Sequence, residues 1–157
     1  MTEGVRAMSA RTMREDLGTP DKVFNPLHAE FRFTVDGAAH AQNAKLPRYW
    51  DDSLDLDWSG ERVWLNPPYG HKNLRRWIGK AWRESQRGAL VVCLVPSNTG
   101  QVWWTEYAIK ASEIRWIRGK LRFEGAKSCA PFASVVLIFL PAVGSNAQVD
   151  RTGGENV

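Results

Sequence analysis

An unbroken apolar run at residues 89–95, Ala-Leu-Val-Val-Cys-Leu-Val, constrains the fold of this chain more than any other sequence feature. A strand that lacks apolar/polar alternation is typical of a parallel sheet covered on both faces. Gly88 precedes the run at a position typical of a helix end. Further upstream, apolar residues recur at the spacing of one helix face: Leu74, Trp77, Ile78, Ala81 and Trp82. A helix that leads into a doubly buried strand predicts an α/β fold.

Further helices and strands are predicted on both sides of this pair. Thr19-Pro20 is a helix start signal, with a capping hydroxyl followed by proline at the first helical position. Pro26 should kink or split that helix. We therefore expect an open α/β sheet, mostly parallel, with an antiparallel C-terminal edge hairpin and ligands at the carboxyl ends of its strands. The expected elements are strands at 31–36, 62–65, 89–95, 113–117 and 134–139, one short strand near 48–50, and a helix at 100–111.

Composition and charge narrow the class of protein. Hydrophobic residues make up 43% and charged residues 24% of the 157 residues, as in ordinary globular proteins. Both ends are polar and lack apolar periodicity, so we expect one folded domain at 17–141 between flexible tails at 1–16 and 142–157. The net charge of +4 favours an anionic partner without proving one.

Cysteine usage bears on the redox compartment. Cys93 and Cys129 belong to no metal-ligand cluster, and the three histidines share no ligand spacing, so we expect neither a disulfide nor a metal. The longest apolar runs have only strand length, so neither a signal peptide nor a membrane span is expected. These features indicate a reducing cytoplasm. They leave the oligomeric state open between monomer and homodimer.

Asn66-Pro67-Pro68-Tyr69, between a predicted strand and a predicted helix, is the strongest chemical signal. By chance, this tetrapeptide should occur about once in a thousand chains of this length, or less often. The Asn66 side-chain oxygen and the Pro67 carbonyl are two hydrogen-bond acceptors that suit an amine attached to an aromatic ring. If both accept from the N–H groups of this amine, its nitrogen lone pair becomes free to react. The prolines fix the direction of the carbonyl, and Tyr69 offers a flat face to an extruded base. An ordinary Pro-Pro turn is the alternative interpretation.

This tetrapeptide is the catalytic motif of amino-group methyltransferases, and residues 18–140 resemble the small Dam-type DNA N6-adenine methyltransferases of phages and prophages. The resemblance implies a single-domain, Rossmann-like S-adenosylmethionine-dependent methyltransferase in the cytoplasm of a bacterial host. The substrate it implies is a flipped-out adenine in double-stranded DNA, with Asn66, Pro67, Pro68 and Tyr69 as catalytic residues. The segments that carry the resemblance are Thr19-Pro20-x-x-x-Phe24, Phe33-Thr34-Val35-Asp36-Gly37-Ala38-Ala39, Asn43-Ala44-Lys45, Asp57-Trp58, the tetrapeptide, Arg118-Gly119-Lys120-Leu121-Arg122-Phe123 and Ala130-Pro131-Phe132.

The resemblance also implies a cofactor site. Asp36 would hold the methionine portion of S-adenosylmethionine, although a turn cap is its alternative role. Asp57 and Trp58 would bind and cover the cofactor's adenine, or else be a surface Asp beside a core Trp. Asp36-Gly37-Ala38-Ala39 stands in place of the Phe-x-Gly-x-Gly loop that many such enzymes carry, and small residues such as Ala38 still permit close approach of backbone to ligand. Thr19, Pro20 and Phe24 would lie beside the cofactor, and Asp51, Asp52 and Asp55 are equal candidates for its ribose.

Two basic clusters are predicted to bind DNA phosphates, which position a duplex without reading its sequence. The first, Lys72, Arg75 and Arg76, directly follows the tetrapeptide. The second lies near the final hairpin and comprises Arg118, Lys120 and Arg122, together with Lys127. A solvated helix face is an equal alternative for Lys80, Arg83 and Arg87. The alternatives for function are the same transfer to cytosine N4, RNA or a protein glutamine, and a catalytically inactive DNA-binding homologue.

Overall fold

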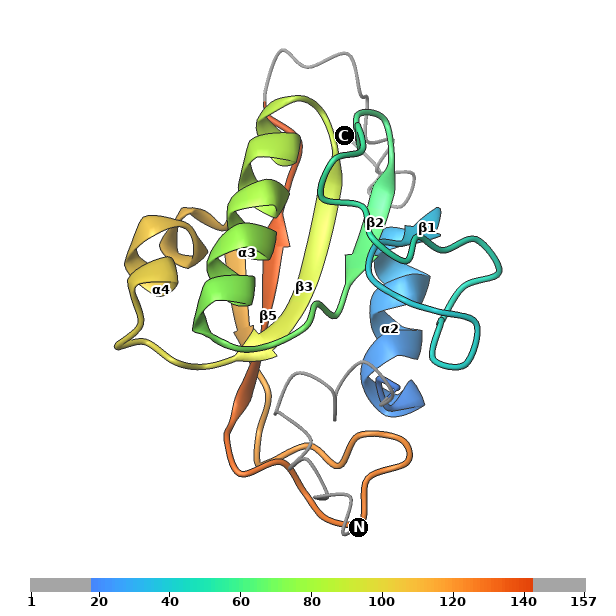
Figure 1. The fold of residues 1–157 in the computed structure, drawn as a ribbon, viewed down its shortest axis with the longest axis vertical. Coiled ribbons are helices and arrows are strands. Elements are labelled where there is room, and N and C mark those ends of the chain that lie inside the picture. The colour runs from blue at the N-terminus through green and yellow to red at the C-terminus, as the bar shows by residue number, and fades with distance from the viewer. Residues whose placement is uncertain (1–17, 143–157) are drawn as a thin grey trace, which may run out of the picture.

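The computed structural model describes residues 18–142, which build a five-stranded sheet between helices. Helix α3 (His71–Gln86) crosses one face of this sheet, and α2 (Asp21–Phe31) packs on the other face (Figure 1). The strands lie in the order β1-β2-β3-β5-β4. Their bounds are Val35–Asp36 for β1, Arg62–Leu65 for β2, Leu90–Pro96 for β3, Glu113–Trp116 for β4 and Ser134–Phe139 for β5.

Strand directions bring the functional segments to one edge of the sheet. β1, β2 and β3 are parallel, whereas β5 is antiparallel to both β3 and β4. The predicted antiparallel hairpin is therefore confirmed, and the sheet is mixed: its β1-β2-β3 end is parallel, and β5 is the one strand within residues 18–142 that runs in the opposite direction. Pro96 at the end of β3 pairs with Ser134, and Trp116 at the end of β4 pairs with Val135. The loop 117–133 therefore leaves the sheet at the carboxyl edge of the parallel strands.

The N-terminal helix and first strand differ from the prediction. The helix extends to Phe31 and ends at Arg32, whose positive φ of 52° places it in the left-handed region. The first strand therefore keeps only Val35 and Asp36 of the predicted 31–36. The α2 helix continues through Pro26 without splitting, and Pro20 rather than Thr19 occupies its N-cap, with no side-chain capping bond.

Other boundaries agree more closely with the sequence. Strand 62–65, the amphipathic helix and the last two strands are confirmed, while the apolar strand is displaced by one residue, to 90–96. The strand expected near 48–50 is reduced to a single parallel bridge between Asp36 and Tyr49. The expected helix at 100–111 divides into α4 (Val102–Glu106) and a 3-10 turn, η1 (Ala108–Lys110). The predicted tail at 1–16 lies outside the described residues, as does the predicted tail at 142–157 apart from its first residue, Ala142.

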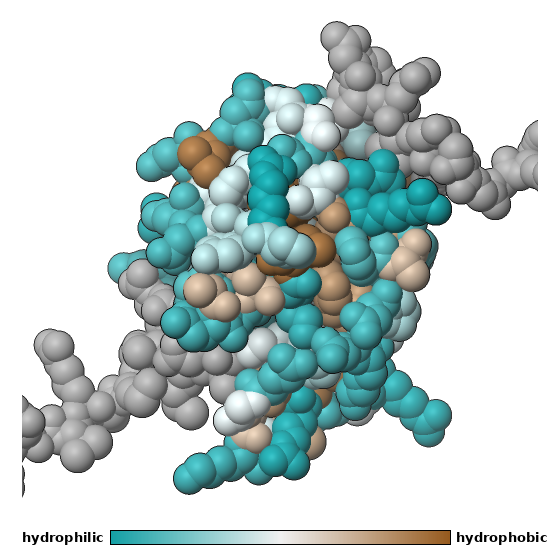
Figure 2. Space-filling model, turned by 90° about the vertical axis from the view of Figure 1, so that its right-hand side faces the viewer, coloured by the Kyte–Doolittle hydropathy of each residue, from teal (hydrophilic) through white to brown (hydrophobic). Residues whose placement is uncertain are grey.

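The core fills both faces of the sheet. Trp58, Trp64 and Trp103 are fully buried in it. Cys93 is also buried, within β3, and burial raises the pKa of its thiol, whereas Cys129 is exposed on loop 117–133. Viewed from the side that carries α2 and β1, the surface is mostly hydrophilic, with small separate hydrophobic areas (Figure 2).

Two further structural findings concern residues 18–142 alone. None of their helices has both the length and the apolar character needed to cross a membrane. Nor do three or more His, Cys, Asp or Glu side chains gather there in a way that could hold a metal ion.

Candidate functional site

A small cavity lies where the predicted catalytic and cofactor segments meet. Asn66 directly follows β2, and the loop that begins at Gly37 directly follows β1, so both leave the sheet at its carboxyl edge. The cavity between them has a volume of about 80 Å³. Its walls are Ala38, Ala39, His40, Asn43, Asp51, Asn66 and Pro68. Two residues of the tetrapeptide and Ala38 of the cofactor loop therefore share one cavity.

The amide of Asn66 is held by the segment that precedes α2. Its Nδ2 donates to the hydroxyl oxygen of Thr19 at 3.3 Å. Thr19 is buried and lies 47 positions away in the sequence. With Nδ2 directed at Thr19, the side-chain oxygen of Asn66 is left to accept from another donor, the role predicted for it from the sequence.

Asp36 is a buried acid at the end of β1, with only 2% of its surface exposed. Its two carboxylate oxygens accept backbone N–H groups, from Ala38 at 3.4 Å and from Lys45 at 3.0 Å. Burial raises the pKa of Asp36 to about 6, although these two hydrogen bonds act in the opposite direction. A buried carboxyl with few partners is suited to a cationic ligand group, which would replace the lost hydration.

The side chain of Lys45 joins three distant parts of this region. Its Nζ donates to Asp21 at 2.6 Å, in the first turn of α2, and to Glu124 at 3.2 Å, on loop 117–133. Burial acts to lower the pKa of Lys45, but the hydrogen bonds to the two carboxylates outweigh it and raise this pKa. Glu124 also forms an antiparallel backbone bridge with Gly18. These contacts hold loop 117–133 against the start of α2.

Tyr69 is buried, so its predicted stacking face is not open in this structure. Its exposed fraction is 3%, and its hydroxyl donates to the carbonyl oxygen of Leu94 at 3.0 Å. Two rings from loop 117–133 meet it at steep angles, Phe123 at 81° and Phe132 at 65°. A base can stack on Tyr69 only if part of this aromatic contact is displaced.

Some predicted cofactor residues do not line the cavity. Trp58 has no exposed surface and donates from its ring nitrogen to the Ser53 carbonyl at 3.0 Å, so it cannot cover a ligand ring here. Asp57 is exposed and accepts hydrogen bonds from the backbone N–H and hydroxyl of Ser59. The pair therefore matches the alternative interpretation, a surface Asp beside a core Trp. Phe24 is buried against Trp64, and Pro20 is buried at the start of α2.

The basic face of α3 is partly neutralised. Arg75 forms a two-point ion pair with Glu106, with both N–O distances 2.8 Å. Lys80 and Arg87 both bind the buried Glu84, at 2.7 and 3.2 Å, so these two positions have structural roles. Lys72 and Arg76 are exposed. On the other basic segment, Arg118, Lys120 and Arg122 are exposed as well, and Arg122 donates to the Ala126 carbonyl.

Three residues of the cavity wall were not predicted from the sequence as site residues: Ala39, His40 and Asn43. His40 lacks ligand spacing to other histidines, so its position gave no signal. Asn43 belongs to the Asn43-Ala44-Lys45 segment that carried part of the family resemblance, and this was the available signal. Of the three acids proposed for the cofactor ribose, Asp51 is the one that lines the cavity.

These features define an α/β protein that carries an amino-methyltransferase motif at the carboxyl edge of its sheet. The sequence profile of the DNA N-6-adenine-methyltransferase (Dam) family matches residues 7–146, and the chain belongs to this family. A curated relative, the DNA N-6-adenine-methyltransferase of Escherichia phage T1, is 27% identical over 114 residues. That match covers 69% of this chain and 47% of the relative, so the chain spans about half the length of the relative it matches.

Proposed function

We propose that this protein transfers the methyl group of S-adenosylmethionine to the exocyclic N6 amine of an adenine in DNA. One observation carries the proposal: Asn66 and Pro68 line the same cavity as Ala38 and Ala39, the loop that directly follows β1. A catalytic amide and a cofactor loop must adjoin if a methyl group is to pass between their ligands. Family membership supports the choice of adenine N6 and of DNA as the substrate.

The proposed chemistry assigns each residue of the tetrapeptide a role. The Asn66 side-chain oxygen and the Pro67 carbonyl accept the amine's N–H groups, which favours a pyramidal nitrogen with its lone pair free. Pro67 and Pro68 restrict the backbone and so keep that carbonyl in a fixed direction. Tyr69 stacks on the adenine once it has left the duplex, after part of the contact with Phe132 is displaced.

The residues around the cavity fit the proposed cofactor. When bound, S-adenosylmethionine supplies a methyl group already activated on a sulfonium. The buried Asp36 carboxyl is suited to the cationic amine of its methionine portion. Gly37 packs closely against β2, because a Cβ there would lie 2.7 Å from a Val63 methyl, and this packing holds the start of the loop that lines the cavity. Asp51, which lines the cavity, would bind the ribose hydroxyls, and Thr19 would orient the Asn66 amide through their hydrogen bond.

The proposal also covers the fold and the partner. The reversed β5, inserted between two strands that run in the opposite direction, fits a Rossmann-like methyltransferase sheet with a C-terminal edge hairpin. Double-stranded DNA would lie across the carboxyl edge, with Lys72, Arg76, Arg118, Lys120 and Arg122 as candidate phosphate contacts. The site of action would be the cytoplasm of a bacterial host.

The test is methyl transfer from labelled S-adenosylmethionine to unmethylated DNA, followed by digestion and identification of the modified nucleoside. We expect N6-methyldeoxyadenosine from the unaltered protein and none from Asn66→Ala. Asn25→Ala, on the exposed side of α2, is the matched control and should retain activity. N4-methyldeoxycytidine, or label in RNA or protein only, would contradict the adenine assignment.

A further inference from the structure

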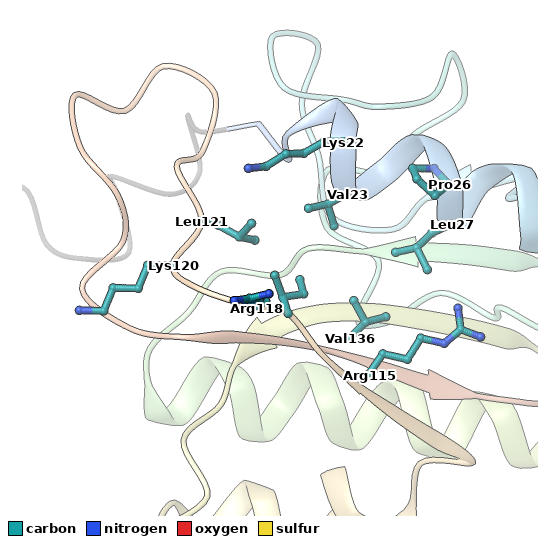
Figure 3. Close-up of a pocket in the computed structure, with 10 residues that line it drawn as sticks. Lys22, Val23, Pro26, Leu27, Arg115, Arg118, Lys120, Leu121 and Val136 are labelled. Atoms are coloured by element: carbon teal, nitrogen blue, oxygen red, sulfur yellow. The ribbon is translucent and has the colours of Figure 1, made fainter.

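A second and larger hollow lies on the α2 side of the sheet, between that helix and the start of loop 117–133 (Figure 3). Its volume is about 390 Å³, within the range of roughly 300–1,000 Å³ that small-molecule sites occupy. Aliphatic side chains line it from the helix, the loop and β5: Val23, Leu27, Leu121 and Val136. We call this hollow the α2 groove.

Cations line the same groove. Lys22 approaches from α2, and Arg118 and Lys120 come from the segment after β4 (Figure 3). Within residues 18–142, none of the three forms an ion pair or a side-chain hydrogen bond, and all three are exposed. Arg115 also lines the groove, but Glu30 neutralises it through two bonds of 2.6 and 2.7 Å. The groove therefore combines an aliphatic wall with three uncompensated positive charges.

This combination differs from the α3 face, the other basic surface near the tetrapeptide. There Arg75 is paired with Glu106, and Lys80 with Glu84, whereas Lys72 and Arg76 are exposed. A phosphate at Arg75 or Lys80 would have to displace a carboxylate, whereas a phosphate at Lys22, Arg118 and Lys120 would displace only water. Charge complementarity therefore favours the α2 groove for an anionic ligand that also has an apolar part.

The walls of the groove continue to the reacting centre. The helix that supplies Lys22 and Val23 begins next to Thr19, which binds Asn66. The loop that supplies Lys120 and Leu121 reaches Phe123, which contacts Tyr69. The two chain segments that line the groove therefore also contact the tetrapeptide, so a DNA strand bound at Tyr69 could reach both.

We propose that the α2 groove is a second nucleotide subsite for the substrate DNA. The base of a nucleotide near the target adenine packs against the aliphatic wall, and its phosphate binds Lys22, Arg118 and Lys120. The DNA backbone supplies the anion, and one nucleotide accounts for both the hollow and its charges. This inference rests on the proposed function, because it takes DNA to be the substrate.

The test uses a 5′-phosphorylated tetrathymidylate, which contains no adenine and so cannot occupy the methyl-accepting position as a substrate. Binding to the full chain is followed by NMR of the Val23, Leu27, Leu121 and Val136 methyl groups. We expect these methyl signals to shift on titration.

Lys22→Gln and Lys120→Gln should each weaken binding at least threefold and lower the slope of log K against log salt by about 0.7. Arg83→Gln, the same charge change at an exposed α3 position, is the matched control and should bind like the unaltered protein.

A second variant separates the base from the phosphate. Val23→Trp fills the groove and leaves its charges in place, so it should weaken the binding of tetrathymidylate. An abasic tetranucleotide should bind weakly both to Val23→Trp and to the unaltered protein. Equal binding of the abasic and thymidine forms would overturn the subsite, as would methyl shifts confined to other residues or tighter binding of an acidic peptide.

Methyl transfer to adenine-containing DNA, measured separately, distinguishes the two proposals. Methyl transfer without shifts in the groove would overturn the subsite alone. Shifts in the groove without methyl transfer would contradict the proposed function instead.

Discussion

Replacing Asp36 with Asn should stabilise the cofactor-free protein at high pH, although it removes a residue proposed to bind the cofactor. Burial raises the pKa of Asp36 from 3.8 to about 6. Each unit corresponds to about 1.4 kcal/mol, so the ionised carboxylate costs the native state about 3 kcal/mol above pH 6. Asn removes this cost but keeps only one acceptor for two N–H groups, a loss of about 1 kcal/mol. The expected net gain at pH 8 is about 2 kcal/mol.

The pH dependence of this gain has a definite sign. Between about pH 4 and pH 6, the native state holds more protons on Asp36 than the unfolded state does. The free energy of unfolding of the unaltered protein therefore falls as pH rises through this window. The cost of ionised Asp36 is about 1 kcal/mol at pH 4.5 and about 3 kcal/mol at pH 8, so the advantage of Asp36→Asn should shrink by about 2 kcal/mol on acidification.

Urea unfolding followed by tryptophan fluorescence, at pH 8 and pH 4.5, measures this difference. Asp55→Asn is the matched control, because it makes the same chemical change at an exposed position and should alter stability by less than about 0.5 kcal/mol at both pH values. If the stabilities of Asp36→Asn and the unaltered protein change in parallel with pH, then burial does not raise the pKa of Asp36 as described above.

Substitutions at three other places test separate parts of the site. Tyr69→Phe removes the 3.0 Å hydroxyl bond to a β3 carbonyl, so it should lower the free energy of unfolding by about 1 kcal/mol and reduce methyl transfer less than Tyr69→Ala does. Gly37→Ala would place a Cβ 2.7 Å from a β2 methyl, and thermal denaturation should show a loss of about 1–3 kcal/mol together with weaker cofactor binding. Arg76→Gln should flatten the salt dependence of duplex binding by about 0.9 log unit, and Arg75→Gln should leave it nearly unchanged because Glu106 already neutralises that charge.

Elements with a strong local pattern were predicted well from the sequence. Helix α3 was predicted because its apolar residues repeat at helical spacing, and β3 because residues 89–95 form an unbroken apolar run. The first strand was predicted too long, because nothing in the sequence indicates that Arg32 adopts a left-handed conformation. Such a conformation is uncommon outside glycine, so a rule based on residue type does not find it.

The tetrapeptide and its position after β2 were also predicted, but its surroundings were not. Tyr69 is covered by Phe123 and Phe132, more than 50 positions further along the chain. The partners of Lys45 lie 24 and 79 positions away. Contacts of this kind depend on how the sheet brings distant loops together, and no local spacing encodes them. The ion pairing that separates Arg75 from Arg76 has the same origin.

The two cysteines of this chain differ in accessibility, so a single fluorophore can be attached to the protein at a known position. Cys93 is enclosed in β3, where its thiol resists ionisation and reagents cannot reach it, whereas Cys129 is exposed. A maleimide fluorophore added to the native, unmutated protein should therefore attach at Cys129 alone. The dye would then sit on the same segment that contacts Tyr69 and Lys45, and its emission could report in real time when a nucleic acid arrives there.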